Sequence, residues 1–534
     1  MVEHDTAIIE NSTHIKSEKD GQLDIQHVES SNLDYDAQRL HDLGYKQEFK
    51  REISLLVQSG FSSATMAVLP NWMVGFGGSM VAGGPSSLFW GWIVVVPFVL
   101  CIAFSMAEVI SAYPLAGGIY SWSFLLSNKK WGPFMAWISG YIYCIGLVTA
   151  NMTLAWSSVD FIFGIANVLN VGQITSQGAY VGLYCGIFVL ATFCNWFGMK
   201  FSSIMNKFII FWVGIGTLII VCCVPAMAPT HRSAKWVFLE FLNKTGYDNK
   251  GMAFLLGLVS NTAPVCIETM KSNISFLFLL GYECGAQIVE GTKRADVTAP
   301  RGIIICIISA VVQGFALILI TLFSIQDVDA IIESSMPVAT FFTQTTNDKL
   351  CVFFLVILLV AQFASLCNSM LATIHIFWAL SRDGCFPYSK VWYKLHPKTN
   401  VPTNALLLQL VISIILIMPS FGSEVYWQAI MSAAVISINV SYGLPLLCRL
   451  IWVRGDMPRG PFSLGKLGIP LNIISCIWVG FFGVILCIPS VSPVTPVTMN
   501  WASVMICGIM GFSVIFWFVS GRKSYKGPIE TTDE

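Results

Sequence analysis

Long apolar runs separated by short polar segments fill most of the chain. A helix that crosses a bilayer core about 30 Å thick needs about 20 mostly apolar residues. Applied along the chain, that length predicts twelve membrane-spanning helices and therefore an all-α membrane protein. Their centres are expected near Met66, Val96, Tyr143, Phe188, Val213, Leu277, Phe315, Leu359, Ile412, Ala434, Trp478 and Met510.

Polar residues flank this block of spans at both ends. Residues 1–45 are rich in Asp, Glu, Ser, Asn and His and contain few large apolar residues, which is typical of a disordered tail. Because the first apolar stretch begins only after this tail, no cleavable signal peptide is expected. The chain therefore divides into a tail over 1–45, a twelve-helix domain over 46–520 and a short tail over 521–534.

Basic residues gather in alternate loops. Lys129 and Lys130 follow the second span, and Lys293 and Arg294 follow the sixth. The positive-inside rule assigns such loops to the cytoplasm. An even number of spans then puts both termini on the cytoplasmic side. The basic loop after the fifth span is an exception, and it holds a possible glycosylation site at Asn243.

Composition agrees with a membrane protein and excludes some functions. Only 11% of the residues are charged and 55% are hydrophobic, so lipid must be the solvent. Lys+Arg and Asp+Glu are equal at 30 each, which argues against nucleic-acid binding through bulk charge. The 16 cysteines show no metal-site spacing, and four of the seven histidines lie in the tail. We therefore expect no metal or other cofactor, and a membrane enzyme is disfavoured.

Two glycine-containing segments interrupt predicted spans at matching places. QSGFSSATM (Gln58–Met66) clusters poor helix formers around Gly60 in span one. LLGYECGAQ, with Gly281 and Gly285, follows five spans later. Transporters use breaks in corresponding spans of two internal repeats, where freed backbone groups meet the ligand. A close helix crossing is the alternative for each glycine, because small residues let helices approach.

Glu283 favours a functional interpretation of the second break. An ionisable residue inside a membrane is costly and by default marks a functional site. Its carboxylate could hold a proton, bind a cationic substrate, or pair with a basic residue such as Lys207 near the start of span five. We expect a gating or proton-linked role ahead of direct substrate binding.

The polar residues after this break are predicted to form a solvated cytoplasmic turn. Pro300 is expected to start the seventh helix, because proline suits the first helical turn. Glu108, at the cytoplasmic end of span two, is expected to be an interfacial carboxylate. The predicted turn residues are Glu290, Lys293, Arg294 and Arg301.

Span eight carries a polar face in an apolar context. Ser365, Asn368 and Ser369 are three and four residues apart, which puts them on one side of a helix. That side should point into the bundle. Cavity lining and helix-to-helix hydrogen bonding are both consistent with the pattern.

Several ordered motifs carry a resemblance to a known family. They are GYECGAQIVEGTKRADVTAPRGI, AEVISAYPLAGGIYSW and FWALSRDGCFP, together with LGYKQEFKREIS ahead of span one. Over about Leu43–Ser520 the chain resembles the amino acid–polyamine–organocation superfamily of permeases, most closely the fungal branch that carries amino acids, 4-aminobutyrate, choline and related amines. The resemblance implies an inverted five-plus-five repeat with two extra C-terminal helices, in which spans one and six unwind around the substrate.

The resemblance also assigns residues. Members of this group are generally proton-coupled, which suits a site that holds acidic groups. The chain departs from the pattern over Asn261–Ser275, which is either a genuine insertion ahead of span six or sequence that should have been removed, such as a retained intron. Gly60, Phe61 and Ser62 match the unwound part of span one, whose amides would take a substrate carboxylate, and Gly281, Tyr282 and Glu283 match that of span six.

These observations predict a secondary active transporter that imports an amino acid or a small amine, such as 4-aminobutyrate or choline, by proton-driven alternating access. Its partners would be that substrate, the proton and the lipid bilayer. The plasma membrane is favoured over the endoplasmic reticulum or vacuole. The alternatives are a nutrient sensor that keeps the transporter fold, and a permease for a cationic vitamin such as thiamine.

Overall fold

The computed structural model of the chain describes residues 35–42, 51–171, 176–259, 281–421, 424–454, 457–489, 492–495 and 499–527. Within these ranges ten helices are long and apolar enough to cross a membrane, which confirms the predicted all-α membrane protein. They contain α5 (Gly84–Ala112), α7 (Gly132–Val168), α8 (Gln177–Trp196), α9 (Gly198–Met227), α12 (Ala295–Ser324), α15 (Asp348–Arg382), α17 (Thr403–Ile417), α18 (Glu424–Cys448), α19 (Gly468–Ile485) and α20 (Ala502–Phe516).

Four of these helices continue into tighter or wider turns at one end. The 3-10 and π segments lengthen these helices without an intervening loop, so each span is a continuous helical segment. They are η3 (Met418–Phe421) after α17, η4 (Arg449–Val453) after α18, η5 (Gly465–Leu467) before α19, and η6 (Trp517–Gly521) with α21 (Arg522–Ser524) after α20.

Two of the twelve predicted spans do not belong to this set of ten. The first span is divided into α3 (Leu55–Met66) and α4 (Val68–Val81), which meet at Ala67, a residue with φ of 45°. The sixth falls partly outside the described residues, and its described part is the 3-10 helix η2 (Tyr282–Gly291). Irregular backbone therefore occurs in the two spans where the sequence predicts it.

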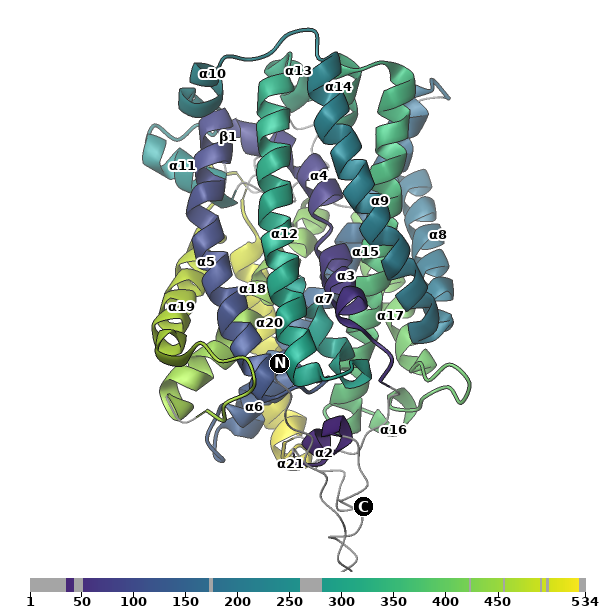
Figure 1. The fold of residues 1–534 in the computed structure, drawn as a ribbon, viewed down its shortest axis with the longest axis vertical. Helices are drawn as coiled ribbons and strands as arrows, with labels where there is room; N and C mark the ends of the chain where they lie inside the picture. The colour runs from purple at the N-terminus through teal and green to yellow at the C-terminus, as the bar shows by residue number, and fades with distance from the viewer. Residues whose placement is uncertain are drawn as a thin grey trace, which may run out of the picture.

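The long helices run side by side, and short elements cover both ends of the bundle (Figure 1). We call the end with α2, α6 and α16 the α2 face, and the end with α10, α13 and α14 the α10 face. The remaining elements are α2 (Tyr35–Asp42), α6 (Ile119–Leu125), α10 (Ala234–Leu239), α11 (Lys250–Val259), α13 (Val328–Glu333), α14 (Pro337–Thr345), α16 (Ser389–Trp392) and the antiparallel pair β1 (Ala82–Gly83) and β2 (Leu242–Asn243).

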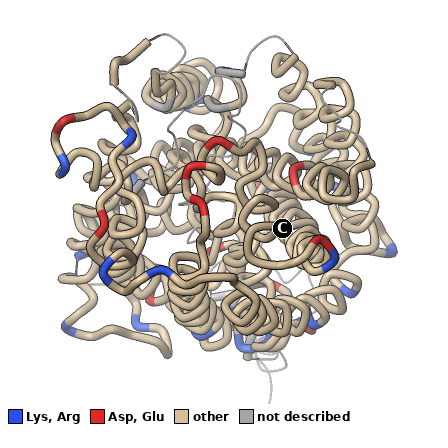
Figure 2. The backbone as a smooth tube through the Cα atoms, turned by 90° about the horizontal axis from the view of Figure 1, so that it is seen from above, with Lys and Arg blue, Asp and Glu red and all other residues tan. Residues whose placement is uncertain are grey.

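Apolar side chains face outward from the peripheral helices. Ile204, Phe211 and Leu218 on α9 are largely exposed, which fits a helix whose solvent is lipid. The inner helix α7 is enclosed, and its Tyr143 is fully buried. Seen along the long axis, most Lys and Arg positions lie towards the rim of the bundle (Figure 2). Glu108, Glu283 and Glu290 are buried, and buried carboxylates need an explanation.

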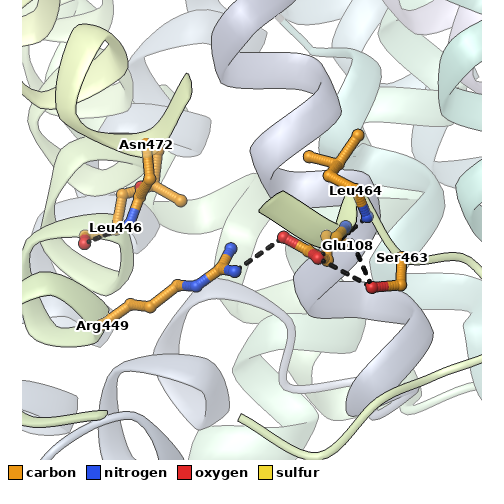
Figure 3. A network of polar contacts seen from close by, with 7 residues as sticks. Glu108, Leu446, Arg449, Ser463, Leu464 and Asn472 are labelled. Carbon is orange, nitrogen blue, oxygen red and sulfur yellow. Dashed lines mark hydrogen bonds and ion pairs between the residues drawn. The ribbon is translucent and has the colours of Figure 1, made fainter. Parts of the chain in front are cut away.

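Glu108 is one of these buried carboxylates, which corrects the prediction of an interfacial residue. Its Oε2 atom lies 2.7 Å from Nη2 of Arg449, at the end of α18 (Figure 3). Its Oε1 atom accepts hydrogen bonds from the Ser463 hydroxyl at 3.2 Å and the Leu464 amide at 2.9 Å. A carboxylate with an arginine and two further donors can be buried, so Glu108 ties α5 to the α18–α19 connection.

The tail prediction also needs correction, for residues 35–42. They form helix α2, which docks on the α2 face. The Tyr35 hydroxyl donates a 2.8 Å hydrogen bond to Oδ2 of Asp296, and Leu40 is buried against Leu115. The polar contact fixes this segment to the start of α12, and the apolar contact fixes it to the connection between α5 and α6. Residues 1–34, 43–50 and 528–534 lie outside the described ranges.

Candidate functional site

The two irregular spans lie against each other in the centre of the bundle. Gly281, at φ 93°, precedes η2, and a methyl group built on it would lie 3.3 Å from Cγ2 of Thr65 near the end of α3. A methyl group on Gly285 would lie 2.6 Å from Oγ of Ser62. The positive φ favours glycine at position 281, and a side chain at position 285 would displace the Ser62 and Gln58 side chains. Both glycines of the second segment therefore serve close contact between the two spans.

The break in span one lies seven residues beyond the predicted place. Gly60, Phe61 and Ser62 are inside the regular helix α3, and the chain leaves the helix at Ala67. A methyl group on Gly60 would lie 2.4 Å from Cδ1 of Ile210, so this glycine permits a close crossing of α3 and α9. The helix-crossing alternative therefore explains Gly60. Phe61 and Ser62 are buried on the same helix.

Polar side chains support the break at Ala67. Asn71, in the first turn of α4, donates a 2.9 Å hydrogen bond to the carbonyl of Met66, the last residue of α3. Gln362 of α15 donates in turn to Oδ1 of Asn71 at 3.2 Å. The Ser365 hydroxyl donates to the carbonyl of Thr65 at 3.0 Å. Side chains from α4 and α15 thus satisfy carbonyl groups at the end of α3, as membrane proteins require.

The remaining polar residues of span eight divide between two roles. Asn368 donates a 2.6 Å hydrogen bond to Oδ1 of Asn206, so it links α15 to α9. Ser369 is buried, and its carbonyl accepts from Thr373. Of the predicted face, Ser365 therefore reaches the broken span, Asn368 makes a helix-to-helix contact, and Ser369 is enclosed in the bundle.

Glu283 is fully buried and receives hydroxyl groups on both carboxylate oxygens. The Tyr143 hydroxyl of α7 donates to Oε1 at 3.1 Å, and the Tyr442 hydroxyl of α18 donates to Oε2. The Gly281 amide donates to the Tyr442 hydroxyl at 3.0 Å, and Gln287 donates to the Tyr143 hydroxyl at 3.0 Å. Three helices and the break itself therefore converge on one carboxylate.

Sequence reasoning missed these partners of Glu283. Tyr143 and Tyr442 occur in apolar runs where a tyrosine is more often a core residue, and Gln287 carries no charge to attract notice. A buried carboxylate needs donors, so two tyrosines in two other spans are a signal that could have been sought. Lys207, the basic partner considered from the sequence, is exposed on α9 and does not share this enclosed site.

The turn after η2 is only partly solvated. Lys293, Arg294 and Arg301 are exposed as predicted, but Glu290 is buried, which corrects the sequence interpretation. Its Oε1 atom lies 3.6 Å from Nη1 of Arg382, at the end of α15. The Ala116 amide donates to the same oxygen at 3.3 Å. Helix α12 begins at Ala295 rather than at Pro300, which lies inside it.

A cavity of about 500 Å³ extends from this region towards the α2 face. Gln287, Glu290 and Gly291 of η2 line one side, and Lys200 of α9 and Lys398 of the α16–α17 connection line another. Because Gln287 also binds Tyr143, the inner end of the cavity is one hydrogen bond away from a direct ligand of Glu283. A space large enough for a small molecule is therefore connected to the enclosed carboxylate through Gln287 and Tyr143.

Comparison with known proteins identifies the family. Residues 59–512 match the model of a family described as "Amino acid permease". The chain belongs to this amino acid permease family. The permease is 31% identical to the amino-acid permease BAT1 homolog of Oryza sativa subsp. japonica over 522 residues, which cover 93% of this chain and 96% of that protein.

Further relatives of the permease come from plants and fungi. It is 28% identical to amino-acid permease BAT1 of Arabidopsis thaliana over 513 residues, covering 92% of this chain and 96% of that one. It is 26% identical to amino-acid permease 2 of Neurospora crassa over 500 residues, covering 92% and 88%. The predicted superfamily is thus confirmed, and the permease is a multi-pass membrane protein of amino-acid transport. The predicted insertion over Asn261–Ser275 lies outside the described residues.

Proposed function

We propose that the permease is a secondary active transporter that imports an amino acid or a small amine such as 4-aminobutyrate by proton-coupled alternating access. The observation that carries the proposal is Glu283, a buried carboxylate at a backbone break that accepts hydrogen bonds from the hydroxyls of Tyr143 and Tyr442. A carboxyl group at such a break can take up and release a proton during transport. Broken spans beside an ionisable group are the arrangement by which transporters couple an ion to a substrate.

The substrate site in this proposal lies between the break at Ala67 and the break at Gly281. Within the described residues, the buried hydroxyls of Ser62 and Tyr282 have no hydrogen-bond partner. A buried polar group needs a hydrogen-bond partner, which a bound ligand or a water molecule can supply. These hydroxyls would contact the substrate, and Phe61 would pack against it. Gly281 would set the spacing of the two spans, and Gly60 would hold α3 close to α9 behind the site.

The substrate carboxylate would bind at the start of α4. The amides of Gly60, Phe61 and Ser62 lie within α3, where backbone N–H groups donate to carbonyls of the same helix. We therefore place the group that binds the substrate carboxylate at the break and not at these three residues. In the first turn of α4, the amides of Val68 and Leu69 have no acceptor within that helix and would favour an anion, whereas Pro70 has no N–H and the Asn71 amide donates to the Ala67 carbonyl. Ser365 of α15, with Asn368 and Ser369 deeper in the bundle, would complete the wall opposite.

Glu283 would couple the proton to the conformational change. When the carboxyl is ionised, it can accept both tyrosine hydroxyls, which holds η2 against α7 and α18. A proton on Glu283 turns one of its oxygens into a donor, so we propose that the hydroxyl at that oxygen turns away from the carboxyl group. Protonation would thereby loosen η2 and bias the bundle towards the other open state. Lys207 is exposed and would not take part in this step.

The direction of transport follows from the basic loops. We propose that the α2 face, with the exposed Lys130, Lys293 and Lys398, is cytoplasmic, and that the protein works in the plasma membrane. The cavity then opens towards the cytoplasm, which is where an imported substrate leaves.

Uptake into vesicles tests the proposal. Purified protein is reconstituted, a proton gradient is applied, and accumulation of 4-aminobutyrate, neutral amino acids, choline and thiamine is measured. We expect an amino acid or amine to accumulate, and accumulation to lose its pH dependence in Glu283→Gln but not in the exposed control Glu333→Gln. Saturable binding without accumulation would instead favour a nutrient sensor, and accumulation of thiamine alone would favour a vitamin permease.

A further inference from the structure

The cavity on the α2 face carries charges that the site around Glu283 does not use. Glu52, just ahead of α3, lines it together with Lys200 of α9 and Lys398 of the α16–α17 connection. None of these three side chains has an ion pair or hydrogen bond with another part of the chain that the structure describes. One carboxylate and two ammonium groups therefore face a shared space without partners.

The signs of these charges divide between the two walls. Glu52 belongs to the wall formed by the start of span one and by η2, which is held to it by hydrogen bonds from the Glu52 and Ile53 amides to the Gly291 carbonyl, each 3.0 Å long. Lys200 and Lys398 belong to the opposite wall, where the α8–α9 turn meets the α16–α17 connection. A methyl group built on Gly198 in that turn would lie 2.8 Å from the Thr399 carbonyl, so these two segments are in contact.

A free amino acid matches this division of charge. Its carboxylate would meet Lys200 and Lys398, and its ammonium group would meet Glu52, so one molecule would bridge both walls. At about 500 Å³ the cavity has the size of a small-molecule pocket. Gln287, at the inner end, connects it to the Glu283 site through Tyr143.

We propose that the cavity is a second, weaker amino-acid-binding subsite on the path between the Glu283 site and the α2 face. The inference rests on the proposed transport function, because it names a station on the route of the same substrate. Occupation of the subsite would set the apparent affinity of the permease for substrate arriving from the α2 face. It would leave the affinity for substrate arriving from the α10 face unchanged.

The test compares the two directions of transport in the same cells. The probe is radiolabelled 4-aminobutyrate, or the amino acid selected in the uptake screen, and KM is measured for influx and for efflux from preloaded cells. Exposed charge pairs are individually weak, so both lysines are replaced together. We expect the double variant Lys200→Gln/Lys398→Gln to raise KM about tenfold for substrate that arrives from the α2 face and to leave KM unchanged for substrate that arrives from the α10 face. Glu52→Gln should act in the same direction. Lys394→Gln, an exposed lysine that does not line the cavity, is the matched control.

The outcomes separate the two proposals. Wild-type cells that move no amino acid in either direction overturn the proposed function. Wild-type transport combined with a double variant whose KM is unchanged, or equally raised, in both directions overturns only the subsite. Reconstitution in phosphatidylcholine with and without phosphatidylserine provides a further check, because an effect seen only with the anionic lipid would mean that a lipid headgroup occupies the lysines.

Discussion

Two glutamates on the same short helix have opposite surroundings. Glu283 and Glu290 both belong to η2 and both are buried. Glu290 faces the guanidinium of Arg382, whereas Glu283 receives the hydroxyls of Tyr143 and Tyr442. The ion pair of Glu290 with Arg382 fastens η2 to the end of α15, whereas the hydrogen bonds of Glu283 connect the break to α7 and α18. The difference separates a charge that holds two spans together from a carboxylate at the break, where we propose proton coupling.

Glu108 extends the comparison to a second structural charge. It pairs with Arg449 and accepts two further hydrogen bonds from the 463–464 segment (Figure 3). Both arginine-paired carboxylates therefore fasten connections near the ends of spans, and the hydroxyl-bound carboxylate lies at the break between spans. The following substitutions are ways to break or sharpen this distinction.

The largest effect is expected from Arg382→Gln. The Arg382 guanidinium lies 3.6 Å from Glu290 and 3.4 Å from Asp383, both of which are buried. Removing one member of a buried ion pair costs about 3–5 kcal/mol, because the remaining charge stays buried without that partner. Thermal unfolding of the purified protein should show a strong loss of stability, with the exposed Lys390→Gln as control. The double variant Glu290→Gln/Arg382→Gln should recover part of the loss, and a double variant as unstable as the single one would contradict the pairing.

Glu283→Gln is expected to change transport while sparing stability. The amide keeps the shape and accepts one hydroxyl, but it cannot take up a proton. Hydrogen bonds to charged groups contribute about 1.5–3 kcal/mol each, so uptake should fall about ten- to hundredfold and no longer vary with pH. A pH profile from 4.5 to about 8 measures this, since an ordinary carboxyl titrates near the lower end. A variant that unfolds as readily as Arg382→Gln would place Glu283 with the structural charges.

Tyr442→Phe should lower transport more than Tyr143→Phe. Both remove a donor to Glu283, and both remove an acceptor: Tyr143 accepts from the Gln287 side chain and Tyr442 from the Gly281 backbone amide. A side-chain amide can rotate to another acceptor but a backbone amide cannot, so leaving the Gly281 amide unpaired adds about 1–3 kcal/mol to the loss for Tyr442. The ratio of kcat to KM for uptake, compared between the two variants at one pH, gives the difference. Equal losses would show that the Gly281 contact contributes nothing to the transport step.

Ser62→Ala is expected to have the smallest effect. Within the described residues its hydroxyl has no hydrogen-bond partner, so the unfolding temperature should stay close to that of the wild type. If the hydroxyl binds substrate, KM should rise by about fivefold, which corresponds to one ordinary hydrogen bond of about 1 kcal/mol. Ser59→Ala in the same helix, whose hydroxyl bonds the Leu56 carbonyl and is not part of the proposed site, is the matched control. An unchanged KM would remove Ser62 from the binding site.

The sequence predicts the break beside Glu283 because glycine and a carboxylate are both unusual inside an apolar run. It does not predict the break at Ala67, since alanine is a good helix former and only the packing around it imposes a positive φ. It also misses the pairing of Glu290 with Arg382, because nothing local connects η2 with the end of α15. A charged residue near the predicted end of a span is predicted to be solvated unless its partner in another helix is known, as Arg382 was not known for Glu290.

Ala67 has a consequence for how the permease stores conformational energy. A left-handed conformation costs an L-residue with a side chain about 1–2 kcal/mol, whereas glycine would occupy it almost freely. The break in span one is therefore strained, and the hydrogen bonds of Asn71 and Gln362 stabilise it. If those bonds are lost in another state of the permease, relief of the strain at Ala67 favours a straighter span.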